Sequence, residues 1–471
     1  MIYNSFNFIV LFPLIFMLYY VIPAKYQRVR HLFLLAVSYL LYMNWKPAYA
    51  LILLGVTAVT FLSARLLEQS EKRRRIVWVG GAFSLLPLLF FKYFNFINEQ
   101  IFDLLSLIGL RYELQGLNWT IPIGISFFTF QALGYLFDVY YKRIGAEKDF
   151  LTYALFISFF PSIVSGPINK ATLLIPQLKA VRSYFDKEKA VAGLKLLLWG
   201  MFMKVVVADR LCLFVDTVYA AYQNYSGMTC FVASLLYSFQ IYADFAGYSL
   251  MAIGVGKVLG FELTENFRRP YFAVSVTDFW RRWHISLSTW LKDYVYIPLG
   301  GSRCSKLRNY WNIFLTFLVS GIWHGANWTF IVWGMWHGIA QIIEKAIGQQ
   351  KCDYGWLGKT IKICITFLLI NFAWIFFRLD TIGDSLIVMT KIFSFEGGMD
   401  LYFPGPRDVS FSVMGLMMLF TKDLKDEFFP KAPLLMGNRF LVVRWSAYLI
   451  LLVVIVLSGV FDAGQFIYAN F

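Results

Sequence analysis

Long stretches without a single Asp, Glu, Lys or Arg most strongly constrain what this chain can fold into. Met1–Ala24, Asn309–Ile343 and Trp445–Phe461 are three of them. Across the chain 59% of residues are hydrophobic and 15% are charged, whereas soluble domains carry about 25% charged residues. Such runs match the roughly 20 apolar residues of a membrane-spanning helix. We therefore exclude a soluble or disordered chain and expect roughly ten to twelve spans.

The same pattern predicts an all-α, polytopic transmembrane protein in which residues 1–471 form one domain. The first apolar run has no basic residues before it, so it is interpreted as a span and not as a cleaved signal peptide. Lys25, Arg28 and Arg30 follow this run, and Lys72–Arg75 follow two spans later. By the positive-inside rule, we expect both loops in the cytoplasm and the N-terminus outside.

Positive charge is concentrated between Arg268 and Arg308, in a chain whose net charge is +15. This segment has only two acidic residues, against Arg268, Arg269, Arg281, Arg282, Lys292, Arg303, Lys306 and Arg308. A cytoplasmic loop that follows the positive-inside rule is one explanation. The other explanation is a binding site for the phosphates of a cofactor or of an anionic lipid, and both explanations stay open. Because the basic residues flank apolar runs, we do not expect nucleic-acid binding.

Histidine is rare, and three of the four histidines lie close together in the sequence. His31 begins a predicted helix and is interpreted as an interfacial residue. His324 lies near the middle of the window Asn309–Ile343, where an ionisable group is costly and is usually functional. Nearby glycines permit a broken helix. The alternative is a hydrogen-bonded histidine that only packs helices together.

The other two histidines are less clear from sequence. His337 would lie about 20 Å from His324 on a continuous helix, so we expect it to be structural unless the chain breaks near Gly325 or Gly334. His284 would share one apolar helical stripe with Trp280 and Leu287, and a core histidine is the alternative for it.

Asp244 is a carboxylate between long apolar runs. It is compatible with a proton relay, with a partner for a histidine, or with a packing role beside tyrosine hydroxyls. The Cys, His and Asp residues show no ligand spacing, so no metal site is predicted.

Three motifs carry a family resemblance that runs over nearly the whole chain. They are Asn266-Phe-Arg-Arg-Pro-Tyr271, the run Asp278-Phe-Trp-Arg-Arg-Trp-His284 with its continuation to Ser302, and Gly321-Ile-Trp-His-Gly-Ala-Asn-Trp328. With them the chain resembles the bacterial branch of the membrane-bound O-acyltransferases, and within it the members that acetylate alginate. Lys292 stands where many members have an Arg, which keeps the charge.

The resemblance implies a helical ring in which a cytoplasmic and an extracellular funnel meet at a thin centre. It implies that His324 is catalytic and that His284 is its companion. Acetyl-CoA is then the acyl donor and enters from the cytoplasm, with no permanently bound cofactor. The acceptor is a hydroxyl of an exported polysaccharide or of an extracellular or periplasmic partner protein that relays the acetyl group. The expected location is the plasma (inner) membrane.

Chemistry and position together mark a set of candidate site residues. A neutral imidazole has a pKa suited to taking a proton from a hydroxyl, so His324 is the candidate general base. His284 would orient the donor or stabilise the developing oxyanion. The candidates for substrate binding are Trp323, Asn327, Trp280, Arg281, Arg282 and Asp244.

Two other functions stay open at this point. One is a D-alanyl transferase that uses the thioester of a carrier protein. The other is a component of polysaccharide export or assembly without enzymatic activity, although it leaves the two histidine motifs unexplained.

Overall fold

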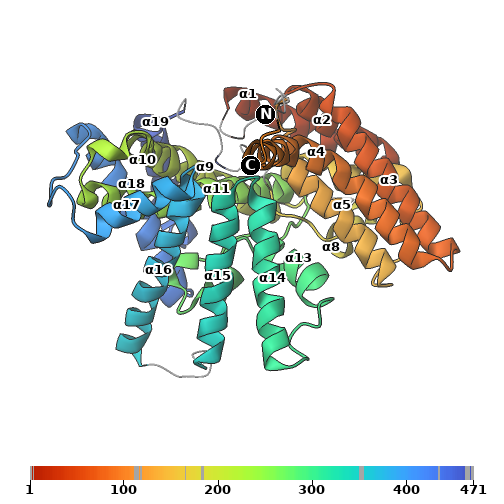
Figure 1. Cartoon of the computed structure of the whole chain (residues 1–471). Helices are drawn as coiled ribbons and strands as arrows, with labels where there is room; N and C mark the ends of the chain where they lie inside the picture. The colour runs from red at the N-terminus through yellow and green to blue at the C-terminus, as the bar shows by residue number, and fades with distance from the viewer. Residues whose placement is uncertain are drawn as a thin grey trace.

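The structure is a computed structural model that describes residues 3, 5–110, 116, 119–164, 166–181, 185–348, 355–432, 435–461 and 467. Every regular element in these ranges is a helix or a helical turn (Figure 1). The all-α architecture expected from the charge-free windows is therefore confirmed.

The first part of the chain forms a group of packed helices at one end of the molecule. They are α1 (Phe6–Val21), α2 (Gln27–Met43), α3 (Tyr49–Gln69), α4 (Arg73–Leu107) and α5 (Ile125–Tyr140). α3, α4 and α5 lie side by side (Figure 1). The path bends by 105° between α1 and α2. Pro23 lies in this break, and it lacks the backbone N–H that a continuous helix would need there.

Three short helices lead to the central layer. They are α6 (Phe150–Ser158), α7 (Phe160–Ile163) and α8 (Ala171–Lys179). The layer itself consists of α9 (Lys187–Phe202), the π-helical turn η2 (Met203–Ala208), α10 (Asp209–Ala220) and α11 (Gly227–Val258). Glycines let α9 approach α11 closely, since a Cβ added at Gly193 would lie 2.6 Å from the carbonyl oxygen of Gly254. Close contacts through small residues are typical of helices that pack in membranes.

The remaining helices carry the histidine motifs and the C-terminal part. They are α12 (Val276–Arg282), α13 (Ile285–Leu291), the π-helical turn η5 (Lys292–Tyr296), α14 (Lys306–His324), α15 (Trp328–Ala346), α16 (Trp356–Arg378), α17 (Ile382–Phe393), α18 (Pro406–Phe428) and α19 (Leu441–Ser458). Short 3-10 turns cover Ala24–Tyr26, Tyr222–Asn224, Pro270–Phe272 and Leu435–Gly437. α14, α15 and α16 run side by side away from the central layer (Figure 1).

The number of long apolar helices is lower than expected. By length and composition, 5 of the described helices could cross a membrane, or up to 6 if the bent pair α1 and α2 is one span. A multi-pass membrane protein is supported, but the expectation of roughly ten to twelve spans exceeds this number. A charge-free window also need not be one helix. The window Asn309–Ile343, for example, is divided between α14 and α15.

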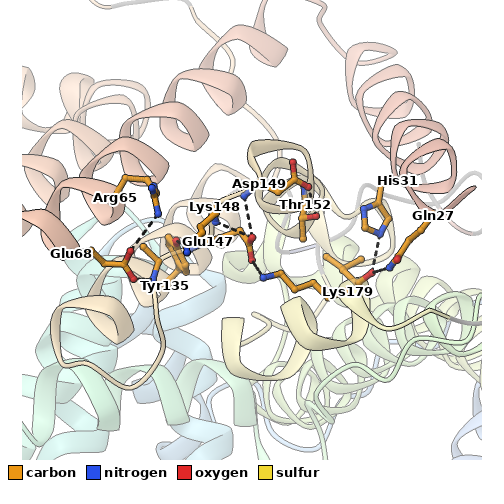
Figure 2. Close-up of polar contacts among 12 residues, drawn as sticks. Gln27, His31, Arg65, Glu68, Tyr135, Glu147, Lys148, Asp149, Thr152 and Lys179 are labelled. Carbon is orange, nitrogen blue, oxygen red and sulfur yellow. Dashed lines mark hydrogen bonds and ion pairs between the residues drawn. The ribbon is translucent and has the colours of Figure 1, made fainter.

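His31 lies in a polar network away from the other three histidines. Its Nε2 is 2.9 Å from the carbonyl oxygen of Leu178 at the end of α8. Gln27 donates to the same oxygen over 2.7 Å, and Lys179 forms a 2.7 Å ion pair with Glu147 (Figure 2). His31 is buried, so it ties α2 to α8 instead of lying at an exposed interface.

Candidate active site

A break between α14 and α15 places His324 at the last position of a helix. Gly325 is extended, with φ −165° and ψ 156°. A Cβ at Gly325 would lie 2.1 Å from two ring carbons of Phe330, so a larger residue does not fit. Asn327 begins the next helix, and its side chain accepts from the backbone N–H of Thr329. The glycines around His324 permit a broken helix, and the structure has this break at Gly325.

The ring of His324 is held in one orientation inside the protein. Only 1% of the residue is exposed. Its Nδ1 lies 2.6 Å from the carbonyl oxygen of Ser320. A carbonyl oxygen can only accept, so Nδ1 carries the proton in this contact and Nε2 of the neutral ring carries the lone pair.

His284 lies at a second break, between α12 and α13. Its φ of 42° is left-handed, so the single helical stripe expected for Trp280, His284 and Leu287 is wrong. The Nδ1 of His284 lies 3.1 Å from Oδ1 of Asn266. Because the backbone N–H of Ser286 also donates to this oxygen, the oxygen is an acceptor and Nδ1 of His284 carries the proton. In its neutral form the companion histidine therefore has the same tautomer as neutral His324.

Trp323 brings the two histidines together. Its ring centroid lies 4.9 Å from that of His324 and 5.9 Å from that of His284, with edge-to-face geometry in both pairs. Phe127 of α5 also contacts Trp323, at 5.7 Å. Three segments distant in sequence thus build one aromatic site, in which the substrate-binding candidate Trp323 contacts both histidines.

The break also brings His337 near His324, because α15 folds back along α14. The ring of Trp333 lies 4.6 Å from His324 and 4.8 Å from His337. Trp280 donates its indole N–H to Nδ1 of His337 over 3.3 Å. The separation expected on a continuous helix does not occur, and His337 is the fixed acceptor for Trp280.

A basic cavity of about 450 Å³ approaches the histidines along α14. Its lining includes Trp280, Arg281, Lys292, Phe317 and Lys345. Phe317 and Trp280 both contact the ring of His337. The basic segment therefore contributes two cations, Arg281 and Lys292, to a hollow that could hold an anionic ligand.

Arg282 does not belong to this lining. It pairs with Asp278 at 3.1 Å and with Glu427 of α18 at 2.8 Å. Glu427 also pairs with Arg269 at 2.7 Å. Partial burial alone would raise the pKa of Glu427, but the hydrogen bonds from Arg269 and Arg282 lower it. Arg282 thus holds α18 against α12, and its predicted role in substrate binding finds no support in these contacts.

A second cavity, of about 400 Å³, lies beyond the end of α14, and we call it the Asp244 cavity. Its lining contains Asp244 and Asn327, together with Lys204, Gln240 and Phe377. Phe377 packs on the ring of His324 at 5.6 Å. The basic cavity thus approaches His337 and the Asp244 cavity approaches His324, and the ring of Trp333 lies between these two histidines.

The partner of Asp244 is a lysine. Lys204 lies 2.7 Å from Asp244 and 2.7 Å from Asp209. Asp244 also accepts from the backbone N–H of Ile467 over 2.8 Å. From sequence, a histidine or tyrosine hydroxyls were considered as partners of Asp244. In the described chain its partners are instead Lys204 and the backbone N–H of Ile467, so Asp244 is part of a buried ion cluster.

Sequence reasoning missed Lys92, which lies beside the site. The residue is 7% exposed on α4, and its ammonium group donates to the backbone oxygens of Trp323 and His324. The signal in the sequence is a single lysine between Phe91 and Tyr93 in an otherwise apolar stretch. Such a lysine marks the end of a charge-free window, but an intramembrane ionisable residue is also a functional candidate.

Comparison with known proteins agrees with these motifs. The family model described as "MBOAT, membrane-bound O-acyltransferase family" matches residues 140–379. The chain is 37% identical over 401 residues to the probable alginate O-acetylase AlgI of Pseudomonas aeruginosa, with 84% of this chain and 75% of the relative covered. It is 35% identical over 429 residues to the peptidoglycan O-acetyltransferase of Helicobacter pylori, with 84% and 80% covered. It is 26% identical over 285 residues to the teichoic acid D-alanyltransferase of Bacillus subtilis, with 59% and 70% covered.

Proposed function

Because the chain belongs to the membrane-bound O-acyltransferase family and is an O-acyltransferase of the membrane, we propose that it moves acetyl groups from cytosolic acetyl-CoA to a hydroxyl of an exported polysaccharide, with His324 as general base. Acetyl-CoA is a substrate in this scheme and not a resident cofactor. The names of the P. aeruginosa and H. pylori relatives support an acetyl group and a glycan acceptor.

The observation that carries the proposal is the fixed ring of His324. Its Nδ1 is bound to the Ser320 carbonyl, so the basic nitrogen of the neutral ring is Nε2. A hydroxyl is a poor nucleophile until a base takes its proton, and such help is worth about 10²–10⁴-fold in rate. In the proposed step the hydroxyl oxygen attacks the thioester carbon, its proton passes to Nε2, and the C–S bond breaks to release CoA, which then takes up a proton.

His284 has a more limited set of roles in this step. Its Nδ1–H is occupied by Asn266, so Nε2 of the neutral ring accepts hydrogen bonds and does not donate them. An oxyanion needs a donor. The geometry therefore favours His284 as a residue that orients a hydroxyl or the donor over one that stabilises the oxyanion.

The basic cavity is the proposed entrance for the donor. Arg281, Lys292 and Lys345 line it, and phosphate groups favour such cations. The nearby Arg303, Lys306 and Arg308 support a cytoplasmic position by the positive-inside rule. The same rule supports an N-terminus outside, and the proposed location is the plasma (inner) membrane.

The Asp244 cavity is the proposed entrance for the acceptor. It lies beyond the opposite end of α14, next to Asn327 and Phe377. Carboxylate and amide groups in its lining can accept hydrogen bonds from sugar hydroxyls. A partner protein that presents a serine would use the same entrance.

Substitution of His324 by alanine tests the proposal. The bound acetate of the surface polysaccharide is measured in a strain that carries only His324→Ala, after its amount in the membrane has been verified. We expect acetylation to be lost. His31→Gln is the matched control, because His31 is also buried but lies in the α2–α8 network. Normal acetylation with His324→Ala would refute the role of this residue.

The similarity to a D-alanyltransferase gives a second candidate donor, the thioester of a carrier protein. Membranes are supplied with acetyl-CoA or with the carrier thioester, and free thiol is measured. Release of CoA that depends on His324 supports acetyl-CoA. Release from the carrier alone supports the alternative, and loss of polymer export without loss of acetylation in a null strain would point to an export component.

A further inference from the structure

A buried lysine from a distant helix contacts the residue at which α14 ends. The ammonium group of Lys92 lies 2.5 Å from the carbonyl oxygen of Trp323 and 3.0 Å from that of His324. Its third contact is the Ser126 hydroxyl, at 3.5 Å. Among the described residues, Lys92 therefore has these three oxygens as acceptors and has no ion pair with a carboxylate.

This arrangement matches what the end of a helix lacks. The last carbonyl groups of an α-helix have no partner within the helix, and the partial negative charge at this end attracts a cation. Tyr93, the next residue on α4, donates its hydroxyl to the carbonyl of Ile322. Lys92 and Tyr93 together therefore supply donors to three consecutive carbonyl groups of α14.

The position of Lys92 also has a cost that calls for an explanation. An ammonium group is expensive to bury even when hydrogen bonds compensate it. A neutral donor such as the hydroxyl of Tyr93 already satisfies one carbonyl group at this helix end. The ammonium of Lys92 reaches the two carbonyl groups nearest the imidazole and lies 5.7 Å from the ring centroid of Trp323.

We propose that Lys92 is a positioning residue for His324, because its ammonium group caps the last turn of α14 and holds the imidazole against Trp323. Helix ends fray when nothing holds them. A displacement of about 1 Å in a reacting group can cost about 10²-fold in rate. The proposal rests on the proposed function of His324, since a residue that positions a base requires that base.

The test compares variants of the full-length protein in membrane vesicles that contain its native acceptor, with acetyl-CoA as the probe. CoA release above the His324→Ala background gives kcat and the KM for acetyl-CoA. We expect Lys92→Met to lower kcat by about 10²-fold and to leave KM within about twofold, because the basic cavity is not touched. Lys92→Arg keeps a cation with several N–H donors and should retain more of kcat than Lys92→Met.

Lys391 provides a matched control. It is also a buried lysine that donates to two backbone carbonyl groups, those of Tyr222 and Gln223 at 3.3 and 3.0 Å. It differs from Lys92 in a further ion pair with Glu396 at 3.2 Å. Lys391→Met should keep kcat, even if it lowers the temperature of unfolding. Equal losses of kcat in the two methionine variants would overturn the proposal, because they would reflect stability alone.

Other outcomes are equally decisive. If Lys92→Met does not accumulate in the membrane, Lys92→Arg is compared with Lys92→Gln, and equal kcat values would overturn the role of the cation. A wild-type kcat in Lys92→Met also overturns it. Wild-type activity in His324→Ala would instead refute the proposed function itself, so the two failures can be told apart.

Discussion

At the scale of single residues, Asn266 is the side chain that binds the ring of His284. The asparagine is fully buried. Its amide oxygen accepts from Nδ1 of His284, from the backbone N–H of Ser286 and from the Ser286 hydroxyl, at 3.1, 3.2 and 2.9 Å. Its amide nitrogen donates to Ser249 of α11 over 3.1 Å. One amide thus fixes the tautomer of His284 and connects the α12–α13 break to α11.

Asn266→Leu should therefore damage both stability and catalysis. The variant leaves the N–H of Ser286 without its acceptor, which costs about 1–3 kcal/mol in free energy of unfolding, and it releases the ring of His284. Thermal unfolding in detergent and CoA release measure the two effects. The control is Asn371→Leu, because Asn371 is also fully buried and bonded to two serines. It should lose stability but keep activity, and equal losses of activity would contradict a specific role for Asn266.

Residue identities could be predicted where motifs carry them, but partners could not. His324, His284 and Trp323 were expected at the site and do lie together. Lys92 contacts residues more than 200 positions away in sequence, and no local pattern predicts that pairing. Arg281 and Arg282 are adjacent and look alike in sequence, yet one lines the basic cavity and the other pairs with Glu427. Only the packing of α18 separates their roles.

At the scale of elements, two helix breaks form the site. α14 stops at His324 and α12 stops just before His284. The glycines around His324 permit the first break, so it could be considered from sequence. The second was missed because His284 itself adopts the left-handed conformation, which residues other than glycine rarely do. The same loss of continuity explains why charge-free windows predict helical content well but do not mark where single helices begin and end.

Gly325→Ala should disturb the first break. Its Cβ would meet the ring of Phe330 at 2.1 Å, so either the ring or the turn after His324 must move. We expect a lower temperature of unfolding and a lower kcat. Gly55→Ala is the control, because nothing lies within 4 Å of a Cβ at Gly55 in α3, and alanine stabilises a helix interior by about 0.5–1 kcal/mol. A Gly325→Ala protein with normal kcat would show that the turn tolerates movement.

At the scale of the whole molecule, two native cysteines report on its orientation. Cys304 is exposed in the basic segment, and Cys212 lines the Asp244 cavity. Two variants are made in which every other cysteine is replaced by alanine. A membrane-impermeant maleimide should label Cys304 only in inverted vesicles and Cys212 only in intact cells. The reverse pattern would place the proposed donor entrance outside the cell and would contradict the entry of acetyl-CoA from the cytoplasm.

The aromatic residues between the cavities have an electrical consequence. Trp333 and Trp374 are fully buried and stack at 5.8 Å beside His324, and Phe377 closes the contact towards the Asp244 cavity. A water-filled cavity conducts ions, whereas a layer of packed aromatic rings that excludes water does not. If the two cavities open to opposite sides, most of the membrane voltage drops across this layer. The enzyme must then act as an insulator as well as a catalyst, and small residues in place of these rings should let protons leak through the cell membrane.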